Sequence, residues 1–412
     1  MTDTAPEPTR DWQTDYDLLD PRYAVDPYPI WDELRQQCPV AHTQRHGGSF
    51  MPTRYDDLRA IARDHDRFSS RDVAVIAGPD DPPPDNGIEM RVPPIDSDPP
   101  EHLRARRMIL PFFSPQLVEE RDEPFTRALC KRLVDGFVER FEAGEDVVDG
   151  AAEYAQQIPP RVIGHLLGIP ESMTDEFVGW VRGILELGYF DDDLRIKSRD
   201  SILNYFIGLV AERLENPGDD LISQLLHGEV DGVAIEPIEV AQTCNLLLIA
   251  GIDTTWSSIG SAIWHLAGHP EDRQRLVDDP GLIPLAVEEL LRAYSPVTMA
   301  RIVAADTEYA GCPMSEGDRI IMNFPAANRD PEAFPDADKV IIDRAENRHI
   351  AFGVGIHRCG GSNQARLEMR VAIEEFLARI PDFELADPGA VTWAAGQVRG
   401  PRILPIRIRQ TR

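Results

Sequence analysis

Apolar residues recur at spacings of three and four over most of the chain after Pro100. This spacing matches the period of an α-helix and predicts amphipathic helices. The segments that carry the pattern are 101–113, 119–142, 172–188, 198–216, 239–268 and 363–377. Strand-like apolar runs are short and cover 301–305, 317–324 and 403–408. The pattern therefore predicts a mainly α-helical fold with small β-sheets.

The segment 79–100 interrupts the helical pattern with eight prolines in 22 residues. Proline-rich segments often separate domains as semi-rigid spacers. Only about 78 residues precede this one, however, and apolar residues such as Val92 and Ile95 interrupt it. We therefore expect a long loop packed on the body of one domain, residues 1–412, because long ordered loops are commonly functional.

The composition disfavours several classes of protein. The chain carries 42 Lys and Arg against 71 Asp and Glu, a formal net charge of −29. Such a charge disfavours nucleic acid and anionic membranes as overall partners. The longest nearly unbroken apolar run, 244–252, is far shorter than the ~20 residues that span a bilayer. The polar, acidic N-terminus has no signal-peptide pattern, and we expect a cytoplasmic protein.

One of the five cysteines lies in an unusual setting. The five stand at positions 38, 130, 244, 312 and 359, without a Cys-x-x-Cys pair, which disfavours disulfide, zinc and iron–sulfur frameworks. Cys359 falls in the glycine-rich run 352–361, just before the predicted helix 363–377. Free N–H groups and the helix dipole at that position favour a thiolate over a thiol. A single thiolate suits the axial position of a haem iron.

The run 352–361 resembles the haem-binding loop of the cytochromes P450, in particular the soluble bacterial members. The matching residues are Phe352, Gly353, Gly355, His357, Cys359 and Gly361. The continuation 365–368 is also similar, whereas Gly360 and Gln364 stand where the family more often has aliphatic residues. The resemblance implies the cytochrome P450 fold, with haem b between a long distal helix and the cysteine loop. It also implies Cys359 as the iron ligand, with Phe352 beside the haem.

Glu289 and Arg292 lie three residues apart on a predicted apolar helix. Alone, such a pair is typical of a surface ion pair. Beside the cysteine loop it resembles the family's Glu-x-x-Arg motif, whose role is structural. The resemblance implies a further arginine that completes the motif, and Arg329 and Arg344 are both candidates.

Residues 250–255, Ala-Gly-Ile-Asp-Thr-Thr, fall inside the apolar helix predicted over 239–268. Gly251 disfavours a helix interior by roughly 1 kcal/mol relative to alanine, and Asp253 and Thr254 compete for backbone hydrogen bonds. We expect a local disruption that leaves the Asp253 carboxyl and the Thr254 hydroxyl free to relay protons; a kink or a polar helix face is the alternative. The segment resembles the family's distal-helix motif, which protonates bound dioxygen and places Ala250 at the haem.

His102 and Arg106 lie four residues apart on one face of a predicted helix and could together hold a carboxylate group. A solvated basic face is the alternative. The resemblance implies that they hold one haem propionate and that Arg301 and His357 hold the other. We expect the remaining arginines nearby to form a positive patch for an acidic ferredoxin or flavodoxin, supplied by an NAD(P)H reductase. These arginines are Arg104, Arg107, Arg358, Arg366 and Arg370.

The resemblance also implies a substrate pocket. Besides the Pro-rich loop, the region 177–190 and Thr254, its expected lining residues are Leu247, Ala250, Val297, Met299, Gln397 and Val398. Most are apolar or small, so we expect a hydrophobic organic substrate, whose identity the sequence does not give. Trp180, Tyr189 and Phe190 suit pocket and core equally, and nothing favours Arg91 or Arg399 as a carboxylate partner.

The activity implied by the resemblance is that of a monomeric monooxygenase. It would insert one atom of O2 into its substrate, by hydroxylation or oxidative dealkylation, with electrons from separate redox proteins. A peroxide-driven peroxygenase and a non-catalytic haem-based sensor or carrier are the alternatives. The Asp253–Thr254 pair disfavours both, because that relay serves the protonation of dioxygen.

Overall fold

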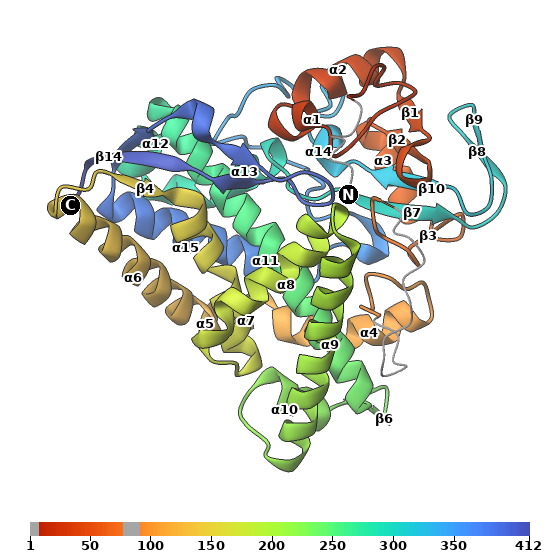
Figure 1. Ribbon diagram of the computed structural model, residues 1–412, viewed down its shortest axis with the longest axis horizontal. Helices are drawn as coiled ribbons and strands as arrows, with labels where there is room; N and C mark the ends of the chain where they lie inside the picture. The colour runs from red at the N-terminus through yellow and green to blue at the C-terminus, as the bar shows by residue number, and fades with distance from the viewer. Residues whose placement is uncertain (1–7, 77–90) are drawn as a thin grey trace.

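The computed structural model describes residues 8–76 and 91–412, in which helices predominate (Figure 1). The longer helices are α2 (Tyr28–Gln37), α6 (Glu123–Glu142), α8 (Thr174–Leu185), α9 (Asp192–Glu215), α11 (Pro237–Gly268), α13 (Ile283–Ala293) and α15 (Ser362–Arg379). The shorter ones are α1 (Pro21–Val25), α3 (Tyr55–Arg63), α4 (Glu101–Ile109), α5 (Pro115–Arg121), α7 (Pro159–Leu167), α10 (Leu221–Leu226), α12 (Pro270–Asp278) and α14 (Phe324–Ala327). The predicted mainly α-helical fold with small sheets is confirmed.

Helix α11 runs through the centre of the molecule, with α7, α8, α9 and α15 packed against it (Figure 1). Its start is fixed by a capping box between Glu236 and Glu239, with Pro237 at the first helical position. By length and composition α11 could cross a membrane, the one such helix in the described ranges, but 78% of its most apolar window is buried inside the protein. A helix that is apolar on all sides and buried is a core helix.

The strands form small sheets beside the helical body. The largest has the order β1-β2-β10-β7-β3, and a second has the order β11-β14-β4. Their bounds are β1 (Val40–Thr43), β2 (Ser49–Pro52), β3 (Phe68–Ser69), β4 (Val147–Asp149), β7 (Met299–Val303), β10 (Arg319–Met322), β11 (Asp382–Leu385) and β14 (Pro405–Gln410). Three hairpin pairs complete them: β5 (Glu229–Val230) with β6 (Val233–Ala234), β8 (Thr307–Tyr309) with β9 (Cys312–Met314), and β12 (Thr392–Trp393) with β13 (Pro401–Ile403).

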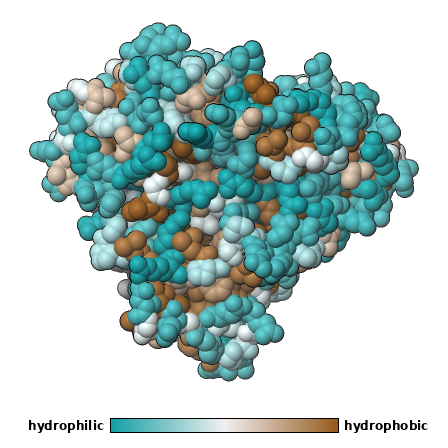
Figure 2. Space-filling view, turned by 180° about the vertical axis from the view of Figure 1, so that it is seen from behind, coloured by the Kyte–Doolittle hydropathy of each residue, from teal (hydrophilic) through white to brown (hydrophobic). Residues whose placement is uncertain are grey.

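One large apolar core surrounds α11, and two smaller cores lie beneath the N-terminal helices and the five-stranded sheet. The face in Figure 2 is mainly hydrophilic, with hydrophobic residues in small scattered groups. A hydrophilic surface is consistent with the high content of acidic residues, because charged side chains are mostly exposed to solvent.

Several predicted boundaries were wrong for local reasons. The helix predicted over 119–142 is two helices, because Pro124 has no N–H to continue α5 and instead begins α6. Helix α9 starts six residues before the predicted 198, capped by Asp191. The strand predicted over 403–408 is interrupted at Leu404. Of the Pro-rich segment, 79–90 lie outside the described residues, whereas Val92 and Ile95 pack on the main core.

Candidate active site

Cys359 lies in a tightly closed loop that leads into α15. The Cys359 N–H donates to the Phe352 carbonyl (2.8 Å), and the Gly353 N–H donates to the Ile350 carbonyl (2.9 Å). Gly355 has φ +80°, and a Cβ there would lie 2.7 Å from the Ala62 carbonyl oxygen, so only glycine suits this turn. The loop therefore holds the Cys359 sulfur at a fixed place beside the start of α15.

The Cys359 side chain is exposed, yet burial is the largest influence on its thiol and raises its pKa. The Gly361 N–H and the guanidinium groups of Arg106, Arg358 and Arg366 act in the opposite direction. Burial thus opposes the predicted preference for the thiolate, whereas the N–H group and the nearby cations support it. The Cys359 sulfur is thus surrounded by protein on most sides, yet one side of it remains accessible. Coordination of a metal would stabilise the thiolate that burial disfavours.

Helix α11 presents a half-buried face at Ala250 and Thr254, one turn apart in an otherwise buried segment. The predicted disruption here was wrong, because α11 is continuous. The Thr254 hydroxyl is not free but donates to the Ala250 carbonyl (2.7 Å), a bond back along the helix. Gly251 instead permits close packing, since a Cβ there would lie 2.9 Å from Ile163 Cδ1 on α7.

The Asp253 carboxyl is fully buried and ion-paired, which corrects the expectation that it is free. Arg402 on β13 approaches it to 2.8 Å, and the Ser257 hydroxyl donates to it (3.1 Å). Burial nevertheless raises the pKa of Asp253, and Glu186 adds to that rise. Arg402 also donates to Glu186 (2.8 Å), so the pair is linked to the C-terminal end of α8. Sequence reasoning missed Arg402, for which no local motif gives a signal.

His102, Arg106, Arg301 and His357 come together as predicted. The His102 and His357 rings lie 4.4 Å apart, and the pKa of His357 falls to about 3 through burial and the nearby charges of Arg301, His102 and Arg106. Arg301 is buried, which lowers its pKa to about 10. Among the described residues, its side chain donates only to the Ala300 carbonyl, and buried His102 Nδ1 has no partner.

These side chains fit the two propionates of haem b. Buried cationic and polar groups without partners are costly, and a pair of carboxylates would satisfy both Arg301 and His102 Nδ1. Cys359 supplies a single soft ligand at the end of the glycine-rich loop, as one axial haem position requires. Ala250 and Thr254 form the half-buried face of α11 that the haem would meet on its other side.

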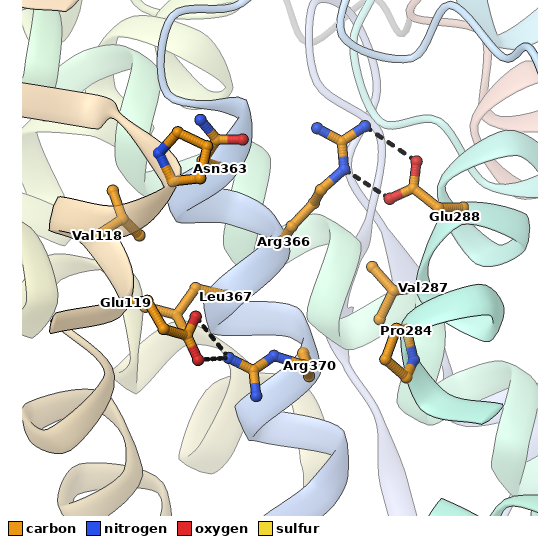
Figure 3. A pocket seen from close by; sticks show the side chains of 10 residues that line it. Val118, Glu119, Pro284, Val287, Glu288, Asn363, Arg366, Leu367 and Arg370 are labelled. Atoms are coloured by element: carbon orange, nitrogen blue, oxygen red, sulfur yellow. Dashed lines mark hydrogen bonds and ion pairs between the residues drawn. The ribbon is translucent and has the colours of Figure 1, made fainter. Parts of the chain in front are cut away.

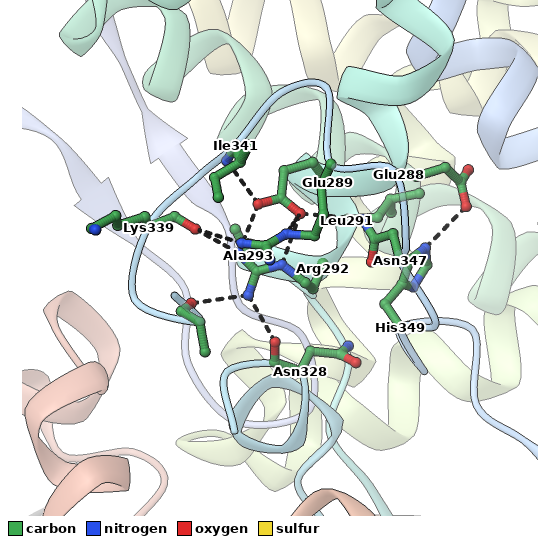
Figure 4. Close-up of polar contacts among 12 residues, drawn as sticks. Glu288, Glu289, Leu291, Arg292, Ala293, Asn328, Lys339, Ile341, Asn347 and His349 are labelled. Carbon is green, nitrogen blue, oxygen red and sulfur yellow. Dashed lines mark hydrogen bonds and ion pairs between the residues drawn. The ribbon is translucent and has the colours of Figure 1, made fainter. Parts of the chain in front are cut away.

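Glu289 and Arg292 are both fully buried, so they are not a surface pair. Arg292 donates twice to the Glu289 carboxylate, at 2.8 Å each, and also to backbone carbonyls, including that of Asn328 (Figure 4). Arg344 completes the network, with its Nε 3.0 Å from Glu289 Oε2. The other candidate, Arg329, donates to the carbonyls of Ala293 and Asp338 instead.

The expected pocket residues divide into two groups. Ala250, Val297, Met299 and Gln397 are half-buried, whereas Leu247 and Val398 are buried in the main core. Val297 pairs with Val398 in an isolated β-bridge, and Gln397 Nε2 lies 3.4 Å from Met299 Sδ. The segments around 297–299 and 397–398 are thus adjacent.

The other pocket candidates have different environments. The Tyr189 hydroxyl accepts from the Gln397 N–H (3.2 Å), so Tyr189 borders the pocket segments. Trp180 packs on Phe177 and Tyr205 in the core. Phe190 is 68% exposed and belongs to neither pocket nor core. Two arginines are already engaged: Arg91 with Asp96 and Glu101, and Arg399 with the carbonyls of Ala24 and Val25.

The expected positive patch is largely neutralised, which corrects that prediction. Its ion pairs are Arg104–Glu239, Arg107–Asp231, Arg366–Glu288 and Arg370–Glu119. Within the described part of the chain, Arg358 is the one arginine of this patch without an acidic partner. Two of these pairs form walls of a groove between α5, α13 and α15, whose apolar residues include Val118, Val287 and Leu367 (Figure 3).

Known proteins share both the sequence and the fold. The family model for cytochrome P450 matches residues 282–388. The chain is 32% identical over 387 residues to the mycinamicin IV hydroxylase/epoxidase of Micromonospora griseorubida, covering 91% of this chain and 94% of that protein. It is 33% identical over 379 residues to the vitamin D(3) 25-hydroxylase of Pseudonocardia autotrophica, covering 90% of each.

The structural comparison agrees. Cytochrome P450 CYP109Q5 from Chondromyces apiculatus superposes with a TM-score of 0.85 at 32% identity, covering 96% of this chain and 98% of that one. The fold and the family expected from the cysteine loop are therefore confirmed. The chain belongs to the cytochrome P450 family and is an oxidoreductase, a haem b monooxygenase.

Proposed function

We propose that this monooxygenase inserts one oxygen atom from O2 into a hydrophobic organic substrate, by hydroxylation or oxidative dealkylation, within a single haem domain of residues 1–412. The half-buried, mainly apolar side chains of Ala250, Val297 and Met299 support a hydrophobic substrate. Gln397 is the polar side chain among them and would orient one substrate group. The relatives named for mycinamicin IV and vitamin D3 differ in substrate, so likeness to them does not select one.

Each haem contact has a candidate side chain. Cys359 would ligate the iron from the proximal side, with Phe352 packed beside the loop. His102 and Arg106 would hold one propionate, and Arg301 and His357 the other. Bound there, haem supplies the dioxygen and one-electron chemistry that no amino-acid side chain provides.

Asp253 and Thr254 would handle protons on the distal side, and this arrangement carries the proposal. The raised pKa of Asp253 lets its carboxyl take up and release a proton, provided that Arg402 opens away from it. The Thr254 hydroxyl donates its hydrogen to Ala250, so its oxygen lone pairs can accept a hydrogen bond and hold a water that would carry a proton from Asp253. This relay favours use of O2 over the peroxide-driven and non-catalytic alternatives.

Electrons would come from an acidic ferredoxin or flavodoxin with its NAD(P)H reductase, in the cytoplasm, to a monomeric enzyme. Arg358 supports docking over the cysteine loop, because it lies near Cys359 and has no acidic partner in the described chain. The neutralised arginines around it make the expected charge complementarity weaker than the sequence suggests.

A screen of hydrophobic compounds for the low-to-high-spin shift of the haem tests the pocket. Turnover of a hit is then compared with reductase, ferredoxin and NAD(P)H, and with hydrogen peroxide alone. Product that requires the electron chain supports the proposal. Product with peroxide alone would indicate a peroxygenase, and spectral shifts without product would indicate a sensor or carrier.

A further inference from the structure

Glu288 precedes the buried Glu289 on α13, but its side chain points away from the Glu289 network and towards His349 (Figure 4). Its carboxylate accepts from Arg366 Nε (2.6 Å) and Nη2 (2.9 Å), and from His349 Nε2 (3.0 Å). Although burial acts to raise its pKa, these hydrogen bonds lower the pKa of Glu288 to about 2. Glu288 is therefore an anion with two partners, and we call the three residues the Glu288 clamp.

Both partners of Glu288 contact the first residues of the cysteine loop. His349 Nδ1 accepts from the Ala351 N–H (3.2 Å), directly before Phe352. The Arg366 guanidinium lies 4.5 Å from the centre of the Phe352 ring, within the range of a cation–π contact. The Phe352 carbonyl in turn accepts the Cys359 N–H (2.8 Å). A continuous series of contacts therefore links the Glu288 carboxylate, through Arg366 and Phe352, to the backbone of Cys359.

The clamp also brings a positive charge to the cysteine loop. The Arg366 guanidinium lies over the ring of Phe352, the residue whose carbonyl accepts the Cys359 N–H. It is 29% exposed and, with Glu288, lines the groove between α5, α13 and α15 (Figure 3). One turn further along α15, Arg370 pairs with Glu119 in the same groove, but no described contact joins that pair to Phe352. The two pairs thus share a surface and differ in their link to the loop.

We propose that the Glu288 clamp is a positioning device for the cysteine ligand, which fixes Phe352 and sets the charge around Cys359, and thereby the reduction potential of the haem iron. The proposal rests on the proposed role of Cys359 as that ligand. Hydrogen bonds, charge and solvent exposure around a ligating sulfur are known determinants of such potentials. Reduction adds an electron to the haem–thiolate unit, so a nearby positive charge favours the reduced state.

Redox titration of the purified haem-loaded protein, without any partner, tests the clamp. Arg366→Gln removes a positive charge and should lower the reduction potential, whereas Glu288→Gln leaves Arg366 unpaired and should raise it. Arg366→Lys keeps the charge and should restore most of the loss seen in Arg366→Gln. The matched controls Arg370→Gln and Glu119→Gln remove the neighbouring pair and should leave the potential at the wild-type value.

Potentials of Arg366→Gln and Glu288→Gln that equal those of the controls, or that move in the same direction, would overturn the proposal. If Glu288→Gln does not fold, the comparison of Arg366→Gln with Arg366→Lys decides, because Arg366 is partly exposed and its replacement leaves no cavity. A wild-type protein whose reduced CO complex lacks the red-shifted Soret band would instead show that the ligand assignment itself fails. The two failures are therefore distinguishable.

Discussion

Arg402, on a strand near the C-terminus, lies 2.8 Å from the carboxylate of Asp253 on the central helix. Asp253 is fully buried and the Arg402 side chain is 8% exposed, so neither charge is well solvated. Arg402 also stacks 4.2 Å from the Trp256 ring and donates to Glu186. One arginine thus joins α8, α11 and β13 and holds the proposed proton donor.

Replacement of Arg402 by methionine should destabilise the protein by roughly 3–5 kcal/mol, because removal of one member of a buried ion pair leaves the other charge unpaired. Urea denaturation measures the loss. Arg409→Met is the matched control: its pair with Glu384 is largely exposed, and it should cost at most about 1 kcal/mol. Equal losses in the two variants would contradict the assigned burial of the Asp253–Arg402 pair.

Thr254→Ala should uncouple electron consumption from product formation, because the hydroxyl that relays protons is lost. The ratio of product to NAD(P)H consumed should fall, and released peroxide should rise. Thr255→Ser, at the adjacent buried position, should leave both values near those of the wild type. Unaltered coupling in Thr254→Ala would refute the relay.

The features that sequence predicts well are carried by consecutive residues. The run 352–361 identifies the family, since its glycines and Cys359 lie close together in the chain. The apolar pattern over 239–268 identifies α11 to within two residues at its start. Both depend on local spacing alone.

The features that sequence missed depend on residues far apart in the chain. Arg402 and Asp253 are 149 positions apart, and Arg104 and Glu239 are 135 apart. The positions of the arginines in the sequence do not reveal which acidic side chains will pair with them. The sequence therefore overestimates the net positive charge of the patch. Burial of the Cys359 thiol also depends on the whole fold, so no local motif reveals it.

Arg344→Ala should destabilise the protein more than Arg329→Ala does. Arg344 contacts the fully buried Glu289 carboxylate, whereas Arg329 donates to backbone carbonyls and stacks 4.1 Å from the centre of the Tyr28 ring, without a described acidic partner. We expect a loss of about 3 kcal/mol or more for Arg344→Ala, with lower haem retention, and roughly 1 kcal/mol for Arg329→Ala. Thermal unfolding and haem content measure both, and a larger effect at Arg329 would reverse the assignment.

The buried Glu368 carboxyl should make the folded protein less stable as the pH rises. It is buried in α15, its one described hydrogen bond is from Gln364 (3.2 Å), and burial raises its pKa from 4.5 to about 8. The folded protein therefore retains a proton that the unfolded chain releases. The contribution of this protonated carboxyl to the free energy of unfolding is complete below pH 4.5. It is lost as the pH rises from 4.5 to about 8.

Glu368→Gln removes this dependence, because glutamine carries no charge at any of these pH values. At roughly 1.4 kcal/mol per pKa unit, the variant should exceed the wild type by several kcal/mol at alkaline pH and differ little near pH 5. The exposed control Glu384→Gln should follow the wild-type profile. Parallel unfolding profiles for Glu368→Gln and the wild type would contradict the raised pKa.

Ligation of the haem iron by Cys359 is the central claim, and the spectrum of the reduced CO complex tests it most directly. Cys359→His should retain some haem but lose the red-shifted Soret band that a thiolate ligand produces. Cys312→Ser, at a half-buried cysteine on β9, should keep that band. A Cys359→His protein whose reduced CO complex has the same Soret band as the wild type would contradict the account.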